Sequence, residues 1–352
     1  MNSSKGTKTV RKILGCAALP LICLFLMFIL CSSMGAKLFV GGISGNISSF
    51  FKNICYFSLL CFAVSINLHT GRMGFDVGAI IVLSTVIGFI VGIETGDNVV
   101  LTILAAMLTG MVLSILSGLV YILLRLPMMI VSLGMTLIYE AVAYWIVRSY
   151  AYGGNVETLQ LKRTVTPELC KISDDITTMI IITAIAVILM VAVFHFTKFG
   201  YDYRALQTGQ KISVSTGINE VKNAVGCYTV AGLLLGVAGI VNYSYANAVQ
   251  PSINFGTVSI MFECFCPLFF GTFLMKYTNK QIGILIGVIS YSFIQTGLGQ
   301  IQIAQNWNNY VIPLINASIL VIFMIYQTNE GAVRTKLGGI SSRRSVVTEE
   351  RQ

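Results

Sequence analysis

The side chains that could carry chemistry in this chain are few, and the acidic ones lie inside apolar runs. Glu140 and Glu263 lie well within such runs, and Glu94 lies at the edge of another. Ionisable groups inside a membrane mark ion or proton pathways, unless they are protonated carboxyls bonded to a neighbouring helix. No basic residue lies at a similar depth to pair with them. This scarcity argues against proton or sodium coupling, and an ion-coupled secondary carrier is kept as an alternative.

Catalytic and metal-binding patterns do not occur in the sequence. There is no G-x-x-x-x-G-K-[ST] signature, so the chain does not bind ATP in that way. His69 and His195 are far apart in sequence, and no Ser–His–Asp or H-E-x-x-H arrangement is present. The nine cysteines have neither metal-ligand nor disulfide spacing. We therefore predict that the chain is not an enzyme and binds no metal or cofactor.

Neutral amide, hydroxyl and indole groups collect instead toward one end of the late apolar runs. Uncharged donors and acceptors beside aromatic faces suit a neutral polyhydroxylated solute, which needs hydrogen bonds and no countercharge. Their grouping on one side favours a translocation path over wetted helix ends. Together with Glu140, the candidate path residues are Asn242, Tyr243, Asn247, Gln295, Gln300, Trp307 and Asn308.

Apolar runs of membrane-spanning length must position these groups. The chain is 55% hydrophobic and 11% charged, whereas soluble domains carry about 25% charge. Crossing the ~30 Å hydrocarbon core takes about 20 apolar residues, which must be helical in lipid. The sequence predicts an all-α polytopic membrane protein with about ten spans. These are 14–31, 51–69, 77–94, 99–124, 126–147, 176–197, 222–246, 256–275, 281–302 and 307–327.

Charge and glycine add detail to this arrangement. If the N-terminus is cytoplasmic, 17 of the 23 Lys and Arg lie on the cytoplasmic side and 6 on the other. We therefore predict a cytoplasmic tail at 1–13, a transmembrane domain at 14–327 and a disordered cytoplasmic tail at 328–352. The net charge of +9 is then a topology signal, and no nucleic acid is expected as a partner. Glycines in 77–94 and 126–147 allow a broken or re-entrant helix there.

Small residues at four-residue spacing let helices approach closely in lipid. The sequence predicts such packing inside one subunit, with a subunit–subunit interface as the alternative. The residues are Gly88 and Gly92, Gly232 and Gly236, and Gly283 and Gly287.

A polar segment, residues 198–222, interrupts the apolar pattern with six charged side chains. It is too polar for lipid and too short to form an enzyme domain. An aromatic-x-aromatic-Arg-Ala pattern followed by Thr-Gly-Ile predicts a short helix held against something outside the membrane. We expect a separate motor protein to act on this segment.

Four stretches carry a family likeness. They are G-R-M-G-F-D-V-G at 71–78, S-L-G-M-T-L-I-Y-E at 132–140, the loop 204–222 with the following 228–240, and the Gln/Asn-rich end of the ninth run. Together they resemble the permease subunit of bacterial ABC importers of the ribose/simple-sugar class, which has relatives for autoinducer-2, nucleosides and branched-chain amino acids. The chain departs from that pattern at Gly74 and Asp76, where the family usually has Asp and Ser.

The resemblance implies a bacterial inner-membrane pore of two permeases, identical or different, driven by two cytoplasmic ABC ATPases. An extracytoplasmic solute-binding protein would deliver a simple sugar. Nucleosides or branched-chain amino acids are alternative solutes, and a non-transporting scaffold is an alternative of another class. The segment 204–218 would be the coupling helix that docks on the ATPase. Its candidate residues are Arg204, Ala205, Gln207, Gly209, Lys211, Thr216, Gly217 and Ile218.

Overall fold

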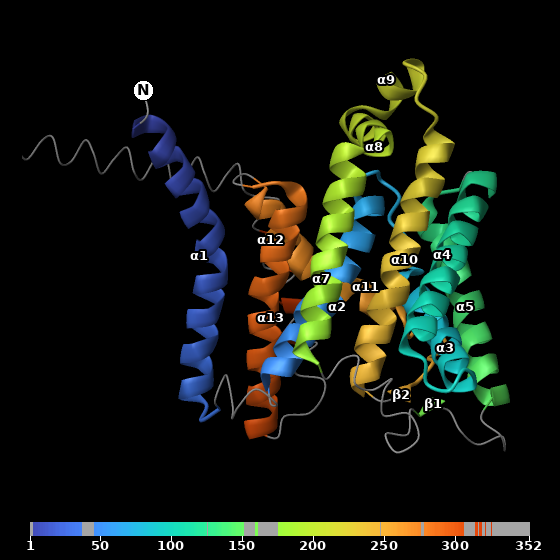
Figure 1. The fold of residues 1–352 in the computed structure, drawn as a ribbon, viewed down its shortest axis with the longest axis horizontal. Coiled ribbons are helices and arrows are strands. Elements are labelled where there is room, and N and C mark those ends of the chain that lie inside the picture. The colour runs from blue at the N-terminus through green and yellow to red at the C-terminus, as the bar shows by residue number, and fades with distance from the viewer. Residues whose placement is uncertain are drawn as a thin grey trace, which may run out of the picture.

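The computed structural model describes residues 3–36, 46–124, 126–150, 159–160, 175–246, 248–275 and 278–305, with six isolated positions between 314 and 325. Nearly all of these residues are helical (Figure 1). The first elements are α1 (Ser3–Ser33), α2 (Asn46–Leu68), α3 (Val77–Glu94), α4 (Val99–Leu124), α5 (Met128–Tyr150), β1 (Leu159–Gln160), α7 (Ile176–Val191) and the π-helical turn η1 (Ala192–Phe196). The later elements are α8 (Lys198–Thr208), α9 (Gln210–Ser215), α10 (Glu220–Ala246), β2 (Ala248–Val249), α11 (Val258–Glu263), α12 (Phe265–Leu274) and α13 (Lys280–Gln305).

The prediction of an all-α membrane protein is confirmed. Among the described residues, eight helices are long and apolar enough to span a membrane: α1, α2, α3, α4, α5, α7 continued by η1, α10 and α13. Strands β1 and β2 are two residues each and form a short antiparallel bridge. Helix α1 begins at Ser3, so it includes most of the predicted tail 1–13. The predicted tail 328–352 and most of the predicted span 307–327 lie outside the described residues.

The continuous span predicted at 256–275 is wrong. The chain forms two shorter helices there, α11 and α12, which meet at Cys264. Pro267 explains the break, because proline has no N–H to donate to the carbonyl of Glu263 four residues earlier. The runs 77–94 and 126–147 form the unbroken helices α3 and α5, so the breaks allowed there do not occur.

Helices α2, α3 and α10 form the centre of the bundle, and α1, α4 and α7 present broad faces to lipid. On α4 the buried residues are small and follow a four-residue period: Thr102, Ala106, Gly110, Ser114 and Gly118. A Cβ at Gly232 of α10 would collide with the carbonyl of Gly110, and one at Gly236 with that of Ala106. Close approach of α4 and α10 therefore depends on these missing side chains.

Helix α1 packs chiefly on α13 at one side of the bundle (Figure 1). The contact is a small apolar cluster of Met27, Cys31, Leu298 and Ile301. The thiol of Cys31 donates to the carbonyl of Gly297 at 3.7 Å.

The two ends of the bundle differ. The start of α1 lies at the same end as α8 and α9, and β1 and β2 lie at the opposite end (Figure 1). We call these the α9 end and the β end.

Candidate functional site at the α9 end

The polar segment between α7 and α10 projects beyond the long helices at the α9 end (Figure 1). It forms two helices separated at Gly209, in place of the single short helix that the sequence predicts. Thr197 caps the start of α8, and its hydroxyl accepts from the N–H of Gly200 at 3.2 Å. The predicted coupling residues lie in α8 (Arg204, Ala205, Gln207), at the break (Gly209), in α9 (Lys211) and after α9 (Thr216, Gly217, Ile218).

The tip of this segment exposes apolar side chains. Ile212 is 72% exposed and Val214 is 46% exposed. Gly217 lies two residues after the end of α9, and its φ of +93° is in the left-handed region. The N–H of Gly217 donates to the carbonyl of Val214 at 3.0 Å, and that of Ile218 to Ser213 at 3.2 Å. This glycine cap sets the direction in which the chain leaves α9 for α10.

Helix α8 is anchored to the bundle through Tyr203. Its hydroxyl donates to the carbonyl of Ile66 in α2 at 2.9 Å, and its ring lies 4.8 Å from that of Phe194. Burial raises the pKa of Tyr203, so the hydroxyl keeps the proton that it donates. The amide of Asn223 in α10 donates to the carbonyl of Phe199 at 3.3 Å. Helix α8 is therefore hydrogen-bonded to α2 through Tyr203, and Phe199 of α8 accepts from α10.

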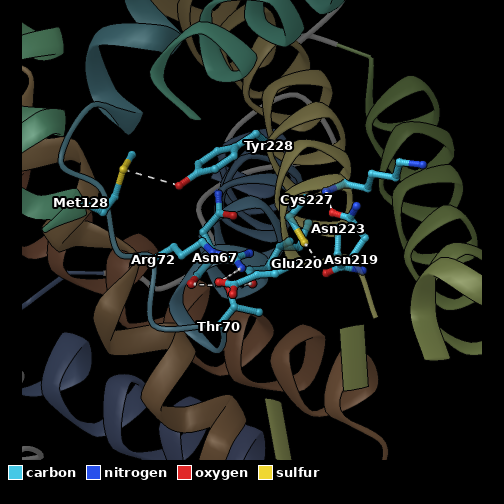
Figure 2. A network of polar contacts seen from close by, with 11 residues as sticks. Asn67, Thr70, Arg72, Met128, Asn219, Glu220, Asn223, Cys227 and Tyr228 are labelled. Atoms are coloured by element: carbon cyan, nitrogen blue, oxygen red, sulfur yellow. Dashed lines mark hydrogen bonds and ion pairs between the residues drawn. The ribbon is translucent and has the colours of Figure 1, made fainter. Parts of the chain in front are cut away.

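An ion pair joins the start of α10 to the loop between α2 and α3 (Figure 2). Nη2 of Arg72 lies 3.0 Å from Oε1 of Glu220, and the side chains are 4% and 33% exposed. Asn219 accepts from the N–H of Lys222 at 3.0 Å and caps α10. A carboxylate in the first helical turn is also favoured by the helix dipole. The first turn of α10 is thus fixed to the α2–α3 loop.

Removal of Glu220 alone is expected to destabilise the protein more than removal of both charges. Glu220→Gln leaves the guanidinium of Arg72 buried without its countercharge, at a cost of about 2 kcal/mol given partial exposure of the pair. Arg72→Gln/Glu220→Gln should recover part of this loss, as measured by thermal unfolding in detergent. Lys222→Gln, an exposed charge in the same turn, is the control. If the stability losses of Arg72→Gln and Glu220→Gln simply add up to that of the double variant, the ion pair has no role in stability.

The same loop is bonded to α5. The N–H of Phe75 donates to Oγ of Ser132 at 2.8 Å, and the hydroxyl of Tyr228 in α10 donates to the sulfur of Met128 at 3.4 Å (Figure 2). Three of the four stretches that carry the family likeness therefore meet here, although they are distant in sequence.

Asp76 lies at the centre of this junction and is 4% exposed. Burial raises the pKa of Asp76 to about 6, although a hydrogen bond with Ser117 lowers it. Its Oδ1 lies 2.6 Å from where a Cβ at Gly74 would be. The glycine therefore makes room for the carboxylate of Asp76.

Asp76→Asn is expected to stabilise the protein in a pH-dependent way. The pKa of Asp76 in the folded protein is above the unfolded value of about 3.9. The free energy of unfolding of the wild type should therefore fall as the pH rises from about 4 to 6. Above pH 6 the Asp76 carboxyl should change it little. The difference in free energy of unfolding between Asp76→Asn and the wild type should grow over the same pH range toward about 3 kcal/mol. Thermal unfolding at several pH values measures it. A difference between Asp76→Asn and the wild type that does not vary with pH would contradict this prediction. Asp97→Asn is the control.

A cleft of about 630 Å³ opens beside the junction. Its walls include the α2–α3 loop, the corner between α4 and α5, and the start of α10. Arg72 lines both this cleft and a smaller cavity of about 20 Å³, which Asn67 also lines. The smaller cavity has the size of one water molecule. The larger cleft lies between three elements, two of which the Arg72–Glu220 pair joins.

The candidate path residues lie on two helices that both pack on α2. Asn242 and Tyr243 lie near the end of α10, and Gln295 and Gln300 lie in α13. The side-chain amide of Gln295 donates to the hydroxyl of Tyr291. Asn247, Trp307 and Asn308 lie outside the described residues.

Glu140, which the sequence places among these path residues, has a different environment. Its Oε1 accepts from the N–H and hydroxyl of Thr257 at 2.8 and 2.7 Å, and its Oε2 accepts from the N–H of Phe255 at 2.9 Å. Asn254 and Phe255 have φ values of 60° and 64°. Consecutive N–H groups in such a turn form an anion-binding concavity. Glu140 therefore holds the non-helical chain that enters the bundle before α11.

Glu263 has a basic residue within electrostatic reach, although that residue lies near the start of its own span. Lys52, in the second turn of α2, interacts electrostatically with Glu263. The pairing depends on how α2 lies against the break between α11 and α12, which the apolar pattern does not reveal.

The fold and these contacts can now be compared with known proteins. The family model described as "Branched-chain amino acid transport system / permease component" matches residues 46–325. The chain belongs to this family. The permease is therefore a multi-pass membrane protein and a transport component, and the expected family likeness is confirmed. Helix α1 lies outside the matched residues.

Curated relatives cover most of the permease at low identity. Ribose import permease protein RbsC of Escherichia coli (strain K12) is 21% identical over 308 residues, which are 87% of this chain and 91% of the relative. Autoinducer 2 import system permease protein LsrC of Photorhabdus luminescens is 23% identical over 291 residues, 82% of each chain. The LsrC protein of Yersinia pseudotuberculosis serotype O:3 (strain YPIII) is 25% identical over 268 residues, 75% of this chain and 72% of the relative. No solved structure matches the permease.

Proposed function

We propose that this permease is the transmembrane subunit of an ATP-driven, binding-protein-dependent importer of a simple sugar in the bacterial inner membrane. The observation that carries the proposal is the α8–α9 segment, which projects from the bundle and exposes Ile212 and Val214 at its tip. Relatives named for import of ribose and autoinducer 2 support a sugar as the solute.

We expect a different partner protein at each end of the bundle. The excess of Lys and Arg assigns the α9 end to the cytoplasm, where an ABC ATPase would bind α9. A solute-binding protein would dock on the β end, and a second permease, identical or different, would complete the pore. Both termini are then cytoplasmic.

The contacts at the α9 end suggest how the ATPase would act. Closure of the ATPase pair would displace α9, and Tyr203 and Asn223 would pass the movement to α2 and α10. The Arg72–Glu220 pair would extend it to the α2–α3 loop. Movement of one helix group against another is a common route to alternating access.

Glycine-lined seams are the surfaces on which such rocking would occur. Gly232 and Gly236 face α4, and Gly283 and Gly287 face the backbone of α12. In α3, a Cβ at Gly88 would lie 2.8 Å from that of Ala106, and Gly92 is buried one turn later. Glycines at these positions let the helix backbones approach closely.

A second solute class has its own support. The family is described by transport of branched-chain amino acids, so a permease for these, or for nucleosides, is the second candidate. An ion-coupled carrier is the alternative of another class.

Reconstitution tests the proposal. The permease is co-expressed with the ATPase and binding-protein genes encoded beside it, purified as a complex and placed in liposomes. Uptake of D-ribose should require ATP and the binding protein, and Ile212→Asp at the tip of α9 should prevent recovery of the ATPase. Uptake driven by an ion gradient without ATPase would overturn the proposal.

A further inference from the structure

The side chain of Arg72 lies between two hollows at the α9 end. Glu220 binds its Nη2, and both residues line the cleft of about 630 Å³ (Figure 2). Arg72 also lines the cavity of about 20 Å³. Its Nη1 is buried and has no hydrogen-bond partner among the described residues. An unpaired donor on a buried charged group is more costly than one on a neutral group, so Nη1 requires an acceptor that these residues do not supply.

Asn67 presents the complementary group. Its Oδ1 is an acceptor that is likewise buried and unpaired within the described chain. Its backbone carbonyl accepts from the N–H of Arg72 at 2.9 Å, so the two residues are close neighbours (Figure 2). Both line the smaller cavity. An unpaired donor and an unpaired acceptor therefore border the same small space.

The remaining walls of the smaller cavity come from α2, α3, α4, α5, α10, α11 and the α2–α3 loop. Most of the wall residues are apolar, and a wholly apolar cavity stays dry. Asp76, which also lines the cavity and is buried, adds carboxylate oxygens that accept hydrogen bonds. The cavity is thus bordered by a cation, an anion and a neutral amide.

The size and polarity of the cavity determine what it can bind. A water molecule needs about 10–15 Å³ of such space and two to four polar partners, and the cavity offers about 20 Å³. A metal cation would lie beside the guanidinium of Arg72, and an anion would lie beside the carboxylate of Asp76. Water is neutral, and it both donates and accepts hydrogen bonds. It can therefore bind all three polar groups without an uncompensated charge.

We propose that the smaller cavity binds one water molecule as a structural ligand. The water accepts from Nη1 of Arg72 and donates to Oδ1 of Asn67 and to the carboxylate of Asp76. It therefore joins the end of α2 to the start of α3, while Glu220 holds the other side of Arg72 to α10. This inference goes beyond the proposed function and does not depend on the solute or on any partner protein.

X-ray radiolysis of the purified full-length permease in detergent tests the site. Radicals formed from a bound water oxidise methionine side chains beside it, and each oxidised methionine gains one oxygen atom. Met261 is 0% exposed and lines the smaller cavity but not the larger cleft. Met179 of α7 is 1% exposed and lines neither. Mass spectrometry of peptides should show that Met261 is oxidised severalfold faster than Met179.

Two variants assign the oxidation to this cavity. Asn67→Leu removes an acceptor of the water, and Ala63→Val fills the space from one turn earlier on α2, where Ala63 lines the cavity. Each should lower the oxidation rate of Met261 severalfold. Met128 also lines the larger cleft, so its oxidation should persist. Ala141→Val makes the same change as Ala63→Val on the exposed face of α5 and is the matched control.

The wild-type comparison decides the question even if a variant does not fold. Equally slow oxidation of Met261 and Met179 would overturn the inference, because no water would then lie beside Met261. Fast oxidation of Met261 that persists in both folded variants would also overturn it, because the radicals would then come from another place. Neither result would affect the proposed function, which reconstitution tests separately.

Discussion

A valine at position 217 is expected to uncouple ATP hydrolysis from solute uptake while leaving the permease in the membrane. Gly217 has a φ of +93°, and no atom lies within 4 Å of where its Cβ would be. The effect of the change is therefore backbone strain and not a collision. A β-branched residue in the left-handed region costs about 1–2 kcal/mol. It should displace the cap that directs α9 toward α10.

The measurement is the number of solute molecules taken up per ATP hydrolysed by the reconstituted complex. We expect this ratio to fall at least tenfold in Gly217→Val, with ATP hydrolysis retained. Gly96→Val is the control, since Gly96 also has a positive φ of +73° and open space, but follows α3, at the other end of that helix from the α2–α3 loop. If both variants keep the wild-type ratio, the coupling role of the α9 end is wrong.

Glu140→Ala is expected to cost about 3–5 kcal/mol of stability. The change removes three hydrogen bonds to one buried carboxylate and leaves the N–H groups of Phe255 and Thr257 unpaired at membrane depth. Unpaired backbone groups are especially costly there. Glu140→Gln should lose less stability, because the amide oxygen of the new side chain can still accept a hydrogen bond. Thr257→Val should lose the least stability.

Thermal unfolding and recovery of monodisperse protein in detergent test this order. The same series separates the two roles considered for Glu140. A variant Glu140→Gln that is as stable as wild type but transports no sugar would return Glu140 to the translocation path. A graded loss of folded protein would assign it to support of α11.

The apolar pattern was sufficient to predict the membrane helices, because lipid imposes both their length and their hydrogen bonding. It also predicted that the polar segment before α10 lies outside the membrane. The break at Cys264 was not predicted from hydropathy, since residues 256–275 are apolar on both sides of it. Pro267 was the available signal.

The roles of the two deep glutamates were harder to predict. Each is a lone carboxylate in an apolar run, so sequence alone treats Glu140 and Glu263 alike. Their environments differ in what other parts of the chain contribute. The N–H groups of Phe255 and Thr257 donate to Glu140, whereas Lys52 is within electrostatic reach of Glu263. The small-residue stripe of α4 was also missed, although its four-residue period is visible in the sequence.

The departure from the family pattern at Gly74 and Asp76 has a local explanation. The carboxylate of Asp76 occupies the space that a side chain at position 74 would need. A side chain at position 74 is therefore incompatible with Asp76 in its present rotamer.

The packing of α1 on α13 has a consequence for how the chain is made. The contact between Cys31 and Gly297 spans 266 residues. During synthesis α1 therefore cannot make this contact until α13 has also been made. The helices between α1 and α13 are all available for packing before α1 docks on α13.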